Sequence, residues 1–349
     1  MESLIRQWDG ESVVVRQDRE TGAWIFIAVH SSLLGPATGG TRMRCYPRVD
    51  DALEDALRLA AAMTYKYAVV GFPRGGGKAV ICLPEGFDPA ARPGLLRRYG
   101  SLLRQLGGFF FTGPDVGTSP EDMDVIAETG APYVFARTPA RGGAGGSGPA
   151  TALGVFVALQ AAAESALGSP SLAGRRVLVQ GAGSVGGTLI ERLVAAGAEV
   201  VWSDVDPAAL ERFRDGLGLP FVSPESVYDT PCDLFSPCAL GGVLSEATIP
   251  RLRCRAVAGA ANNQLATPED AERLRARGIL YAPDFVVSRG GSVAITGMEA
   301  MGWSRERAEE EVRRIGDTLR SVFARAEAEG ITTDEAARRI ARDRLAGRA

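Results

Sequence analysis

The sequence predicts an α/β protein of two domains, an N-terminal α/β domain followed by one built on a doubly wound parallel sheet. Three observations support this. The chain has 349 residues, too many for one ordinary hydrophobic core. Strand and helix patterns alternate along most of it, and the glycine-rich stretch 138–150 has no periodicity, as expected of a domain junction. We therefore predict domains over residues 1–140 and 150–329, and a C-terminal helix over about 330–349.

The first domain opens with strand signals. Polarity alternates over residues 13–16 and 24–30 on either side of Glu20-Thr21-Gly22, which predicts a β-hairpin. Apolar residues then recur at helical spacing over residues 50–66, and an apolar run over 79–83 predicts another strand.

The rest of the first domain leads to an acidic side chain. A helix is predicted over about 90–106, and the compact strand 109–111 runs into Thr112-Gly113-Pro114-Asp115. Asp115 is thus expected at the carboxyl end of a strand. Ser119 and Pro120, followed by acids, predict the start of the next helix.

The second domain carries a nucleotide-binding pattern. A helix is expected from Thr151, and strand 176–180 then runs into Gly-x-Gly-x-x-Gly at 181–186. A helix to about 196 and a strand over 199–203 ending at Asp204 complete the context of a Rossmann-type domain. Such glycines let a pyrophosphate meet backbone amides at a helix N-terminus. Asp204 can accept from ribose hydroxyls and would repel an extra phosphate, so NAD is favoured over NADP.

Three further strands, over 232–235, 256–258 and 279–281, alternate with helical signals as a doubly wound sheet requires. Ligands bind such sheets at the carboxyl ends of the strands. The loops 236–239 and 259–263 are therefore expected to border the ribose and nicotinamide. Asn262 and Asn263 could equally be turn residues.

Composition excludes several classes of function. The net charge is −3 and arginines alternate with acids, as over 305–314, so neither a nucleic-acid surface nor a polybasic membrane surface is expected. No apolar run approaches the length of a membrane span, and the N-terminus lacks the apolar core of a signal peptide. We expect a cytoplasmic enzyme.

Cysteine and histidine argue against metal and triad chemistry. The five cysteines are scattered without a Cys-x-x-Cys pair, so we expect them to be reduced and mostly buried. His30 is the only histidine, which excludes histidine-rich metal sites and serine-histidine triads. No metal is expected, and a structural role is predicted for His30.

Lysine use points to catalysis. Only Lys66 and Lys78 are lysines among 39 basic residues, and lysine, unlike arginine, can lose its proton near neutral pH. Lys78 closes a predicted glycine loop, Gly75-Gly76-Gly77, where backbone and ligand can approach closely. The alternative is that an arginine-rich composition left two surface lysines by chance. Lys66 ends the predicted helix, where its charge suits the C-terminus.

An ordered set of motifs resembles the leucine, phenylalanine and valine dehydrogenases related to glutamate dehydrogenase. The resemblance spans nearly the whole chain and rests on residues 35–42, 63–66, 75–78, 112–116, 181–186, 259–264 and 281–285. It implies oxidative deamination of an L-amino acid by NAD, giving a 2-oxo acid, ammonium and NADH, in a cleft between two hinged domains. It also implies that a C-terminal helix braces the first domain and that subunits form homo-oligomers.

The resemblance assigns the catalytic groups. Lys66 would bind the substrate carboxylate, Lys78 would be the base that activates the hydrolytic water, and Asp115 would shuttle the amine proton. Burial beside another cation lowers the pKa of a lysine, so a neutral Lys78 could take a proton while charged Lys66 holds the carboxylate.

The resemblance also supplies binding residues. For the substrate they are Lys66, Gly39, Gly40, Met63, Thr38, Gly113, Asn262, Ser292 and Ile295. For NAD they are Thr151, Gly181, Gly183, Ser184, Val185, Gly186, Asp204, Cys238, Ala239, Ala260, Asn262 and Ser288.

The expected substrate has an apolar side chain. Thr38 stands where glutamate dehydrogenases carry a lysine, so an acidic side chain would lack its counter-ion. Gly113, where leucine enzymes have alanine, resembles the phenylalanine enzymes and removes a methyl group from the presumed pocket wall. A bulky apolar amino acid is therefore favoured, phenylalanine first, with leucine and valine next.

One departure from the family pattern leaves alternatives open. Ser288-Arg289 stands where the family usually has Asn-Ala, and that asparagine helps to seat the nicotinamide. A divergent biosynthetic dehydrogenase on another amino or hydroxy acid is thus possible, although hydroxy-acid chemistry normally needs a histidine and His30 lies far from the cofactor domain. A non-enzymatic NAD sensor is the other class, but a sensor would not require two lysines and an aspartate to converge.

Overall fold

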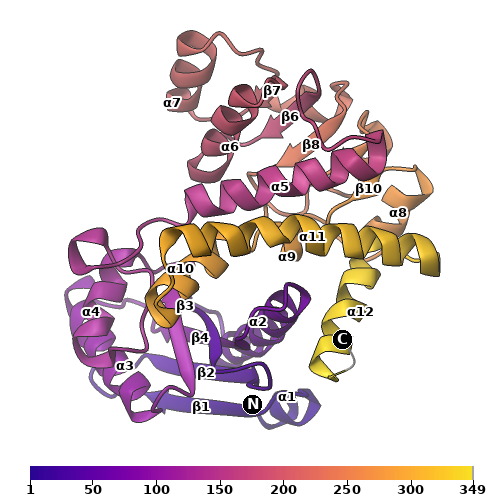
Figure 1. Ribbon diagram of the computed structural model, residues 1–349. Helices are drawn as coiled ribbons and strands as arrows, with labels where there is room; N and C mark the ends of the chain where they lie inside the picture. The colour runs from indigo at the N-terminus through magenta and orange to yellow at the C-terminus, as the bar shows by residue number, and fades with distance from the viewer. Residues whose placement is uncertain (348–349) are drawn as a thin grey trace. The chain divides into compact units, whose positions relative to one another are not determined.

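The computed structural model describes residues 1–347 and divides the chain into two compact α/β units, each with one five-stranded sheet (Figure 1). The first unit comprises Met1–Gly146, Ile295–Ser304 and the chain from Ala341. The second comprises Ser147–Ala294 and Arg305–Ile340. This architecture agrees with the predicted fold class.

The sheet of the first unit has the strand order β1-β2-β4-β3-β5. β1 and β2 form the predicted antiparallel hairpin, whereas β3 pairs in parallel with both β4 and β5. The elements are α1 (Glu2–Gln7), β1 (Ser12–Gln17), β2 (Trp24–Ser31), β3 (Ala37–Cys45), α2 (Val49–Val69), β4 (Gly75–Leu83), η1 (Pro89–Ala91), α3 (Arg92–Gln105), β5 (Phe110–Pro114), α4 (Pro120–Gly130) and η2 (Pro139–Arg141).

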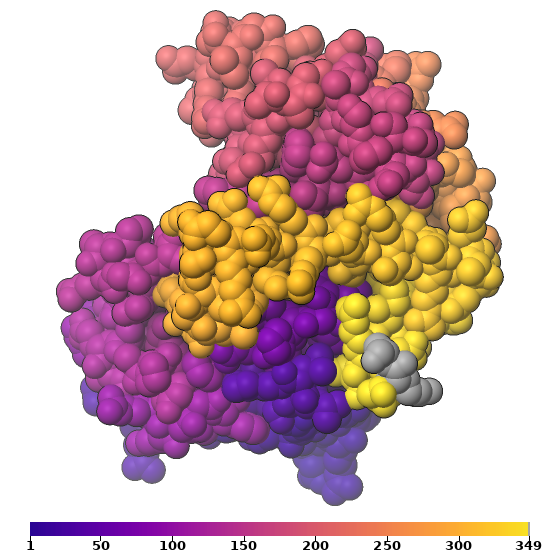
Figure 2. Space-filling view, in the orientation of Figure 1, coloured from indigo at the N-terminus to yellow at the C-terminus, as the bar shows by residue number. Residues whose placement is uncertain are grey.

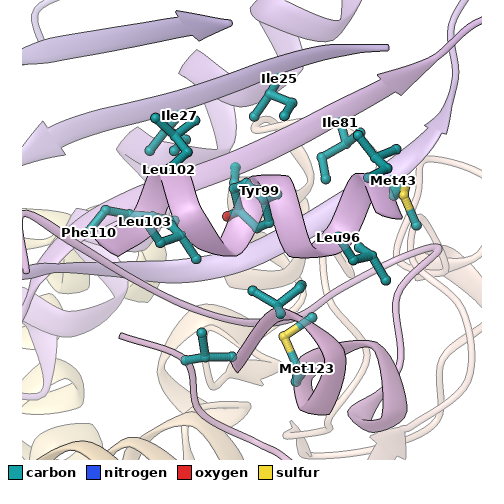
Figure 3. Packing of buried hydrophobic residues seen from close by; sticks show 14 of the residues in the cluster. Ile25, Ile27, Met43, Ile81, Leu96, Tyr99, Leu102, Leu103, Phe110 and Met123 are labelled. Atoms are coloured by element: carbon teal, nitrogen blue, oxygen red, sulfur yellow. The ribbon is translucent and has the colours of Figure 1, made fainter. Parts of the chain in front are cut away.

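Helices cover both faces of this sheet. On one face α3 and α4 place Leu96, Tyr99 and Met123 against Ile25 and Ile81 (Figure 3). On the other face α2 packs on β2 and β4 in a separate cluster that includes Val80 and Cys82. Because side chains alternate along a strand, Lys78 shares the α2 face with Val80 and Cys82.

The glycines before Lys78 do not form the predicted loop. They lie inside β4, where Gly76 is opposite Thr38 of β3 and Gly77 is opposite Val29 of β2. A Cβ on Gly76 would lie 2.1 Å from the backbone nitrogen of Thr64. Gly76 therefore allows β4 to pack directly against α2, a requirement that strand propensity alone does not reveal.

The second unit has the predicted doubly wound parallel sheet, in the order β10-β9-β8-β6-β7. Its elements are α5 (Gly148–Leu167), β6 (Arg176–Gln180), α6 (Ser184–Ala195), β7 (Glu199–Ser203), α7 (Pro207–Ala209), η3 (Leu210–Gly216), η4 (Pro224–Asp229), β8 (Leu234–Pro237), η5 (Ile249–Arg251), β9 (Ala256–Val257), α8 (Asp270–Ala276), β10 (Leu280–Tyr281), α9 (Asp284–Val287) and α11 (Arg305–Glu329). Two more helices, α10 (Gly290–Met301) and α12 (Thr333–Leu345), contain residues of both units.

Helix α5 corrects one prediction from composition. Within the described residues it is the one helix that is long and apolar enough to cross a membrane, although no such run was expected. Its apolar residues have a different role, because Val155, Leu159 and Ala162 are fully buried where α5 packs on α11, α6 and the sheet. The run is apolar because the helix is covered on most sides.

The unit boundaries also differ from the predicted 1–140, 150–329 and 330–349. Residues 295–304 join the first unit because the guanidinium of Arg74 donates to the Ala300 carbonyl (3.1 Å) and the Ala144 amide donates to Glu299 (2.8 Å). The chain returns to the first unit from Ala341, not from 330, since Thr333 still donates to the Tyr281 carbonyl. In Figure 2 the yellow end of the chain lies against the indigo and violet surface of the first unit, where Arg344 donates to the Ala68 carbonyl.

Candidate active site

Lys78 and Asp115 form an ion pair in the first unit. Lys78 is only 5% exposed, and its Nζ lies 3.2 Å from Oδ2 of Asp115. Lys78 comes from the interior of β4, and Asp115 directly follows β5. The structure thus brings together two residues that are far apart in sequence, and Lys78 is not one of two chance surface lysines.

Glycines make room between these two side chains. A Cβ on Gly40 would lie 3.2 Å from Nζ of Lys78 and 2.9 Å from Cβ of Asp115, and one on Gly39 would lie 1.9 Å from the Gly77 carbonyl oxygen. Gly40 is also opposite Gly113 in the β3 and β5 pairing. Gly40 is therefore the position where the missing side chain leaves the backbone beside Lys78 and Asp115 open to close approach by a ligand.

Asp115 is held firmly at the strand end. Its amide donates to Oγ1 of Thr118 (2.9 Å), and that hydroxyl donates to the Thr41 carbonyl (2.7 Å). Oδ2 of the carboxylate accepts a further hydrogen bond from Nε of Arg42 (2.8 Å). Arg42 was not singled out from the sequence. The one sequence feature that could have identified Arg42 is its place in the motif over residues 35–42. Arginine is so abundant in this chain that a single arginine does not stand out.

The electrostatics suit a base beside an ionised acid. Burial lowers the pKa of Lys78; the Asp115 carboxylate opposes this and Arg42 adds to it, but burial dominates. Burial alone would raise the pKa of Asp115, yet Lys78 and Arg42 outweigh it and hold the pKa below its usual value. Lys78 can therefore lose its proton more readily than an exposed lysine, while Asp115 stays ionised. The direction for Lys78 is the predicted one, and Arg42 is a cation that contributes to it.

The other predicted substrate residues of the first unit lie on several elements. Lys66 and Met63 are half-buried on the last turns of α2. Thr38 is fully buried on β3, and its hydroxyl donates to the Pro36 carbonyl (3.1 Å). His30 is buried between Thr64 (2.9 Å) and Asp9 (3.1 Å), which agrees with a structural role.

Gly113 requires a correction. A Cβ at this position would lie 2.4 Å from Cε2 of Phe135, so the aromatic ring already fills the space that a missing methyl group would have opened. Phe135 packs with Ala136 and Ile295 in a small apolar cluster bordered by Phe111 and Ala144. Gly113 therefore admits Phe135 and does not by itself enlarge a pocket.

The glycine-rich turn of the second unit has the form required by a dinucleotide. Gly181 has φ +95°, and a Cβ on Gly186 would lie 1.8 Å from the Gly181 carbonyl oxygen. Gly183 and Ser184 are exposed at the start of α6, whose first turn has no side-chain cap, and Val185 follows them. A Cβ on Gly183 would meet no atom within 4 Å. The open helix N-terminus fits the pyrophosphate of NAD.

Asp204 lies at the carboxyl end of β7, beside that turn. Its Oδ2 accepts from the Ala182 amide, and its Oδ1 accepts from the amides of Val205 (2.6 Å) and Asp206 (2.9 Å). The carboxylate is thus oriented by three backbone amides, and ribose hydroxyls would use its remaining acceptor capacity. Its negative charge is compatible with NAD and unfavourable for the extra phosphate of NADP.

Among the remaining predicted residues of the second unit, Cys238 and Ala239 follow β8, and Ala260 and Asn262 follow β9, so these four lie after the carboxyl ends of strands. A Cβ on Gly181 would lie 2.8 Å from Ala239, and one on Gly186 would lie 3.3 Å from Cys238. Oγ of Ser288 lies 3.5 Å from Oδ1 of Asn262. Thr151 is buried near the start of α5 and Ser292 donates to the Arg289 carbonyl. Of the two residues that depart from the family pattern, Arg289 is 5% exposed and Ser288 is partly exposed.

Two other predictions concern cysteines and metals. All five cysteines are free thiols, and Cys45 is exposed while Cys82 and Cys254 are buried. Residues 1–347 contain no group of three or more histidine, cysteine, aspartate or glutamate side chains that could hold a metal ion.

Comparisons with known proteins match nearly the whole chain. Residues 12–131 match the family model "Glu/Leu/Phe/Val dehydrogenase, dimerisation domain", and residues 142–211 and 208–348 match "Glutamate/Leucine/Phenylalanine/Valine dehydrogenase". The leucine dehydrogenase of Geobacillus stearothermophilus is 41% identical over 97% of this chain and 91% of its own. The valine dehydrogenase of Streptomyces virginiae is 42% identical over 96% of this chain and 93% of its own. The crystal structure of L-tryptophan dehydrogenase from Nostoc punctiforme is similar over 100% of this chain and 99% of that one, with a TM-score of 0.88 and 38% identity.

Proposed function

We propose that this protein, which belongs to the glutamate, leucine, phenylalanine and valine dehydrogenase family, acts on an L-amino acid with a bulky apolar side chain. Like its family, it is an NAD-dependent amino acid dehydrogenase. The reaction would convert the amino acid, NAD⁺ and water to a 2-oxo acid, ammonium, NADH and a proton, and it is reversible as reductive amination. Phenylalanine is the first candidate, with leucine and valine next.

The apolar cluster beside Gly113 carries the proposal for the side chain. This cluster has an apolar surface formed by Phe135, Ile295 and Phe111, and it lies next to β5, the strand that Asp115 follows. Thr38, where glutamate dehydrogenases carry lysine, is uncharged, buried and bonded to the Pro36 carbonyl, so it offers no charge to an acidic side chain. Two phenylalanine rings also favour an aromatic substrate, since aromatic pairs gain about 0.5–1.5 kcal/mol beyond area burial.

The proposed roles follow from the charges of the first unit. Lys66 holds the substrate carboxylate. Lys78, with its lowered pKa, takes a proton from the water that adds to the substrate iminium carbon. Asp115, ionised beside Lys78, accepts a proton from the substrate amine and returns it to the nitrogen of the water adduct. That nitrogen then leaves as ammonia as the carbonyl forms, and it becomes ammonium by taking up the proton that the hydroxyl group releases. NAD, when held by residues 181–186 and Asp204, supplies the two-electron oxidant.

A substrate panel tests this proposal. Initial rates of NADH formation would be compared for L-phenylalanine, L-leucine, L-valine, L-tryptophan and L-glutamate, with phenyllactate as the matched hydroxy acid. We expect kcat/KM for the apolar amino acids to exceed that for glutamate and no turnover of phenyllactate, because His30 is held by Thr64 and Asp9. Glutamate as the best substrate would contradict the proposed side-chain class, and phenyllactate turnover would favour hydroxy-acid chemistry.

Assembly and location belong to the same proposal. The first unit matches a model named for dimerisation, which supports a homo-oligomer formed through this unit. We also infer a cytoplasmic location from the sequence. Light scattering of the purified protein and fractionation of the native cells would test the two points.

A further inference from the structure

Two cations share one oxygen of Asp115. Its Oδ2 accepts from Nε of Arg42 at 2.8 Å and lies 3.2 Å from Nζ of Lys78. Within residues 1–347 the other oxygen, Oδ1, accepts no hydrogen bond, and the side chain is 25% exposed. Oδ1 is therefore the oxygen that remains open to a ligand.

Arg42 is itself anchored from α2. Its Nη1 donates to Oδ2 of Asp55 at 2.8 Å, and the Asp55 side chain is only 12% exposed. Asp55 is fixed in turn by the Tyr46 hydroxyl (2.8 Å) and by Arg58 (2.8 Å). Because a guanidinium is a rigid planar fork, fixing one arm on Asp55 also fixes the direction in which Nε meets Asp115.

We propose that Arg42, anchored by Asp55, is a positioning residue that holds the Asp115 carboxylate by Oδ2 and leaves Oδ1 turned toward the amine of the substrate. The inference rests on the proposed function, in which Asp115 handles the proton of that amine. Neither Arg42 nor Asp55 needs to touch the substrate.

Arg42 and Asp55 have opposite effects on the pKa of Lys78. The charged groups that act on the ammonium are Asp115 after β5, Arg42 on β3 and Asp55 on α2. Beyond the effect of burial, Arg42 lowers the pKa of Lys78, whereas Asp115 and Asp55 raise it. Loss of Arg42 and loss of Asp55 should therefore both release Asp115, but they should move the titration of Lys78 in opposite directions.

Steady-state kinetics over a range of pH form the first test, with the best amino acid of the panel as substrate. For Arg42→Gln we expect kcat to fall about 10–100-fold, as is typical when a supporting partner of a site residue is lost, with a smaller change in KM. The acid limb of kcat/KM should move to higher pH. Asp55→Asn should also lower kcat, but it should move the acid limb of kcat/KM to lower pH. Arg42→Lys keeps the positive charge, so its acid limb should lie near that of the unchanged enzyme and its kcat should exceed that of Arg42→Gln.

Arg58→Gln is the matched control, because Arg58 also bonds Asp55 but is 61% exposed and makes no contact with Asp115. Its kcat and pH profile should stay close to those of the unchanged enzyme. Unaltered kcat in Arg42→Gln, or limbs that move in the same direction in Arg42→Gln and Asp55→Asn, would overturn the inference.

A second measurement does not depend on turnover. The chain has only two lysines, so protein labelled with ¹³C-lysine gives two lysine Cε signals, and the Lys66→Arg variant identifies that of Lys78. Titration of this signal should move up in pH in Arg42→Gln and down in Asp55→Asn. Opposite movements in a protein that oxidises no amino acid would refute the proposed function but support the Arg42 and Asp55 coupling. An active enzyme whose Lys78 titrates identically in all variants would refute the coupling alone.

Discussion

The Phe135 ring occupies the space that a side chain at Gly113 would need, because a Cβ on Gly113 would lie 2.4 Å from Cε2 of the ring. The ring is 8% exposed and packs with Ile295, so it has little freedom to withdraw. The identity of residue 113 thus affects an apolar wall through a neighbour on a different segment.

Gly113→Ala should push Phe135 toward the proposed substrate space. We expect a loss of about 1–3 kcal/mol in the free energy of unfolding, typical of overpacking, and a lower kcat/KM for phenylalanine relative to valine. Denaturant unfolding and the two catalytic efficiencies would measure this. The double variant Gly113→Ala with Phe135→Leu should recover stability, and a fully stable single variant would show that the ring can move without cost.

Lys78→Arg should abolish turnover but keep NAD binding. Arginine stays protonated at all working pH values, so the general base is lost, which typically costs 10²–10⁴-fold in rate, as an order of magnitude. Asp115→Asn should have a similar effect. Single-turnover rates and a fluorescence titration with NAD would separate chemistry from cofactor binding, and near-normal rates in Lys78→Arg would remove Lys78 from its proposed role.

The pH dependence has a definite sign. The pKa of Lys78 is lowered from 10.5, so the neutral base appears at lower pH than for a free lysine. The kcat/KM of the unchanged enzyme should therefore rise with pH through that lowered pKa and level off before 10.5. A rise that occurs only near the pKa of exposed lysine would contradict the effect of burial.

Asp204→Asn should weaken NAD binding and reduce the preference for NAD over NADP. The substitution removes the negative charge beside the glycine turn and weakens the bond to the Ala182 amide. We expect about a tenfold loss in NAD affinity, equivalent to about 1.4 kcal/mol. Asp206→Asn is the control, because Asp206 accepts from the Ala208 amide, and both cofactor dissociation constants should stay unchanged.

Gly76→Ala should disrupt the first unit. The new Cβ would lie 2.1 Å from the Thr64 nitrogen and 2.2 Å from its Oγ1, so β4 and α2 would have to separate. We expect a loss above about 4 kcal/mol, or no folded protein. Gly146→Ala, where a Cβ meets no atom within 4 Å, should express and melt normally. A stable Gly76→Ala variant would show that the contact relaxes easily.

The sequence predicted the second unit closely because its signals are local. The strands over 176–180 and 199–203 have the predicted bounds, and the glycine turn depends on neighbouring residues. The site of the first unit depends on contacts between distant residues. Arg42 bonds to Asp115, which lies 73 positions further along the chain. The sequence shows that both residues are charged but not that they pair with each other. The sequence does not predict the strand over Ala37–Cys45, and it predicts a loop at residues 75–77 where the structure has a strand, because small residues that permit close packing resemble turn residues.

Arg344 also affects the order in which contacts of the first unit can form during synthesis. Its guanidinium donates to the carbonyls of Ala68 and Val69, at the end of the helix that carries Met63 and Lys66. Carbonyls at a helix end lack partners within the helix. Because Arg344 follows the whole second unit in the sequence, this cap can form during synthesis only after the ribosome has made that unit, so these contacts at the end of the helix that carries Lys66 are among the last that the chain can make.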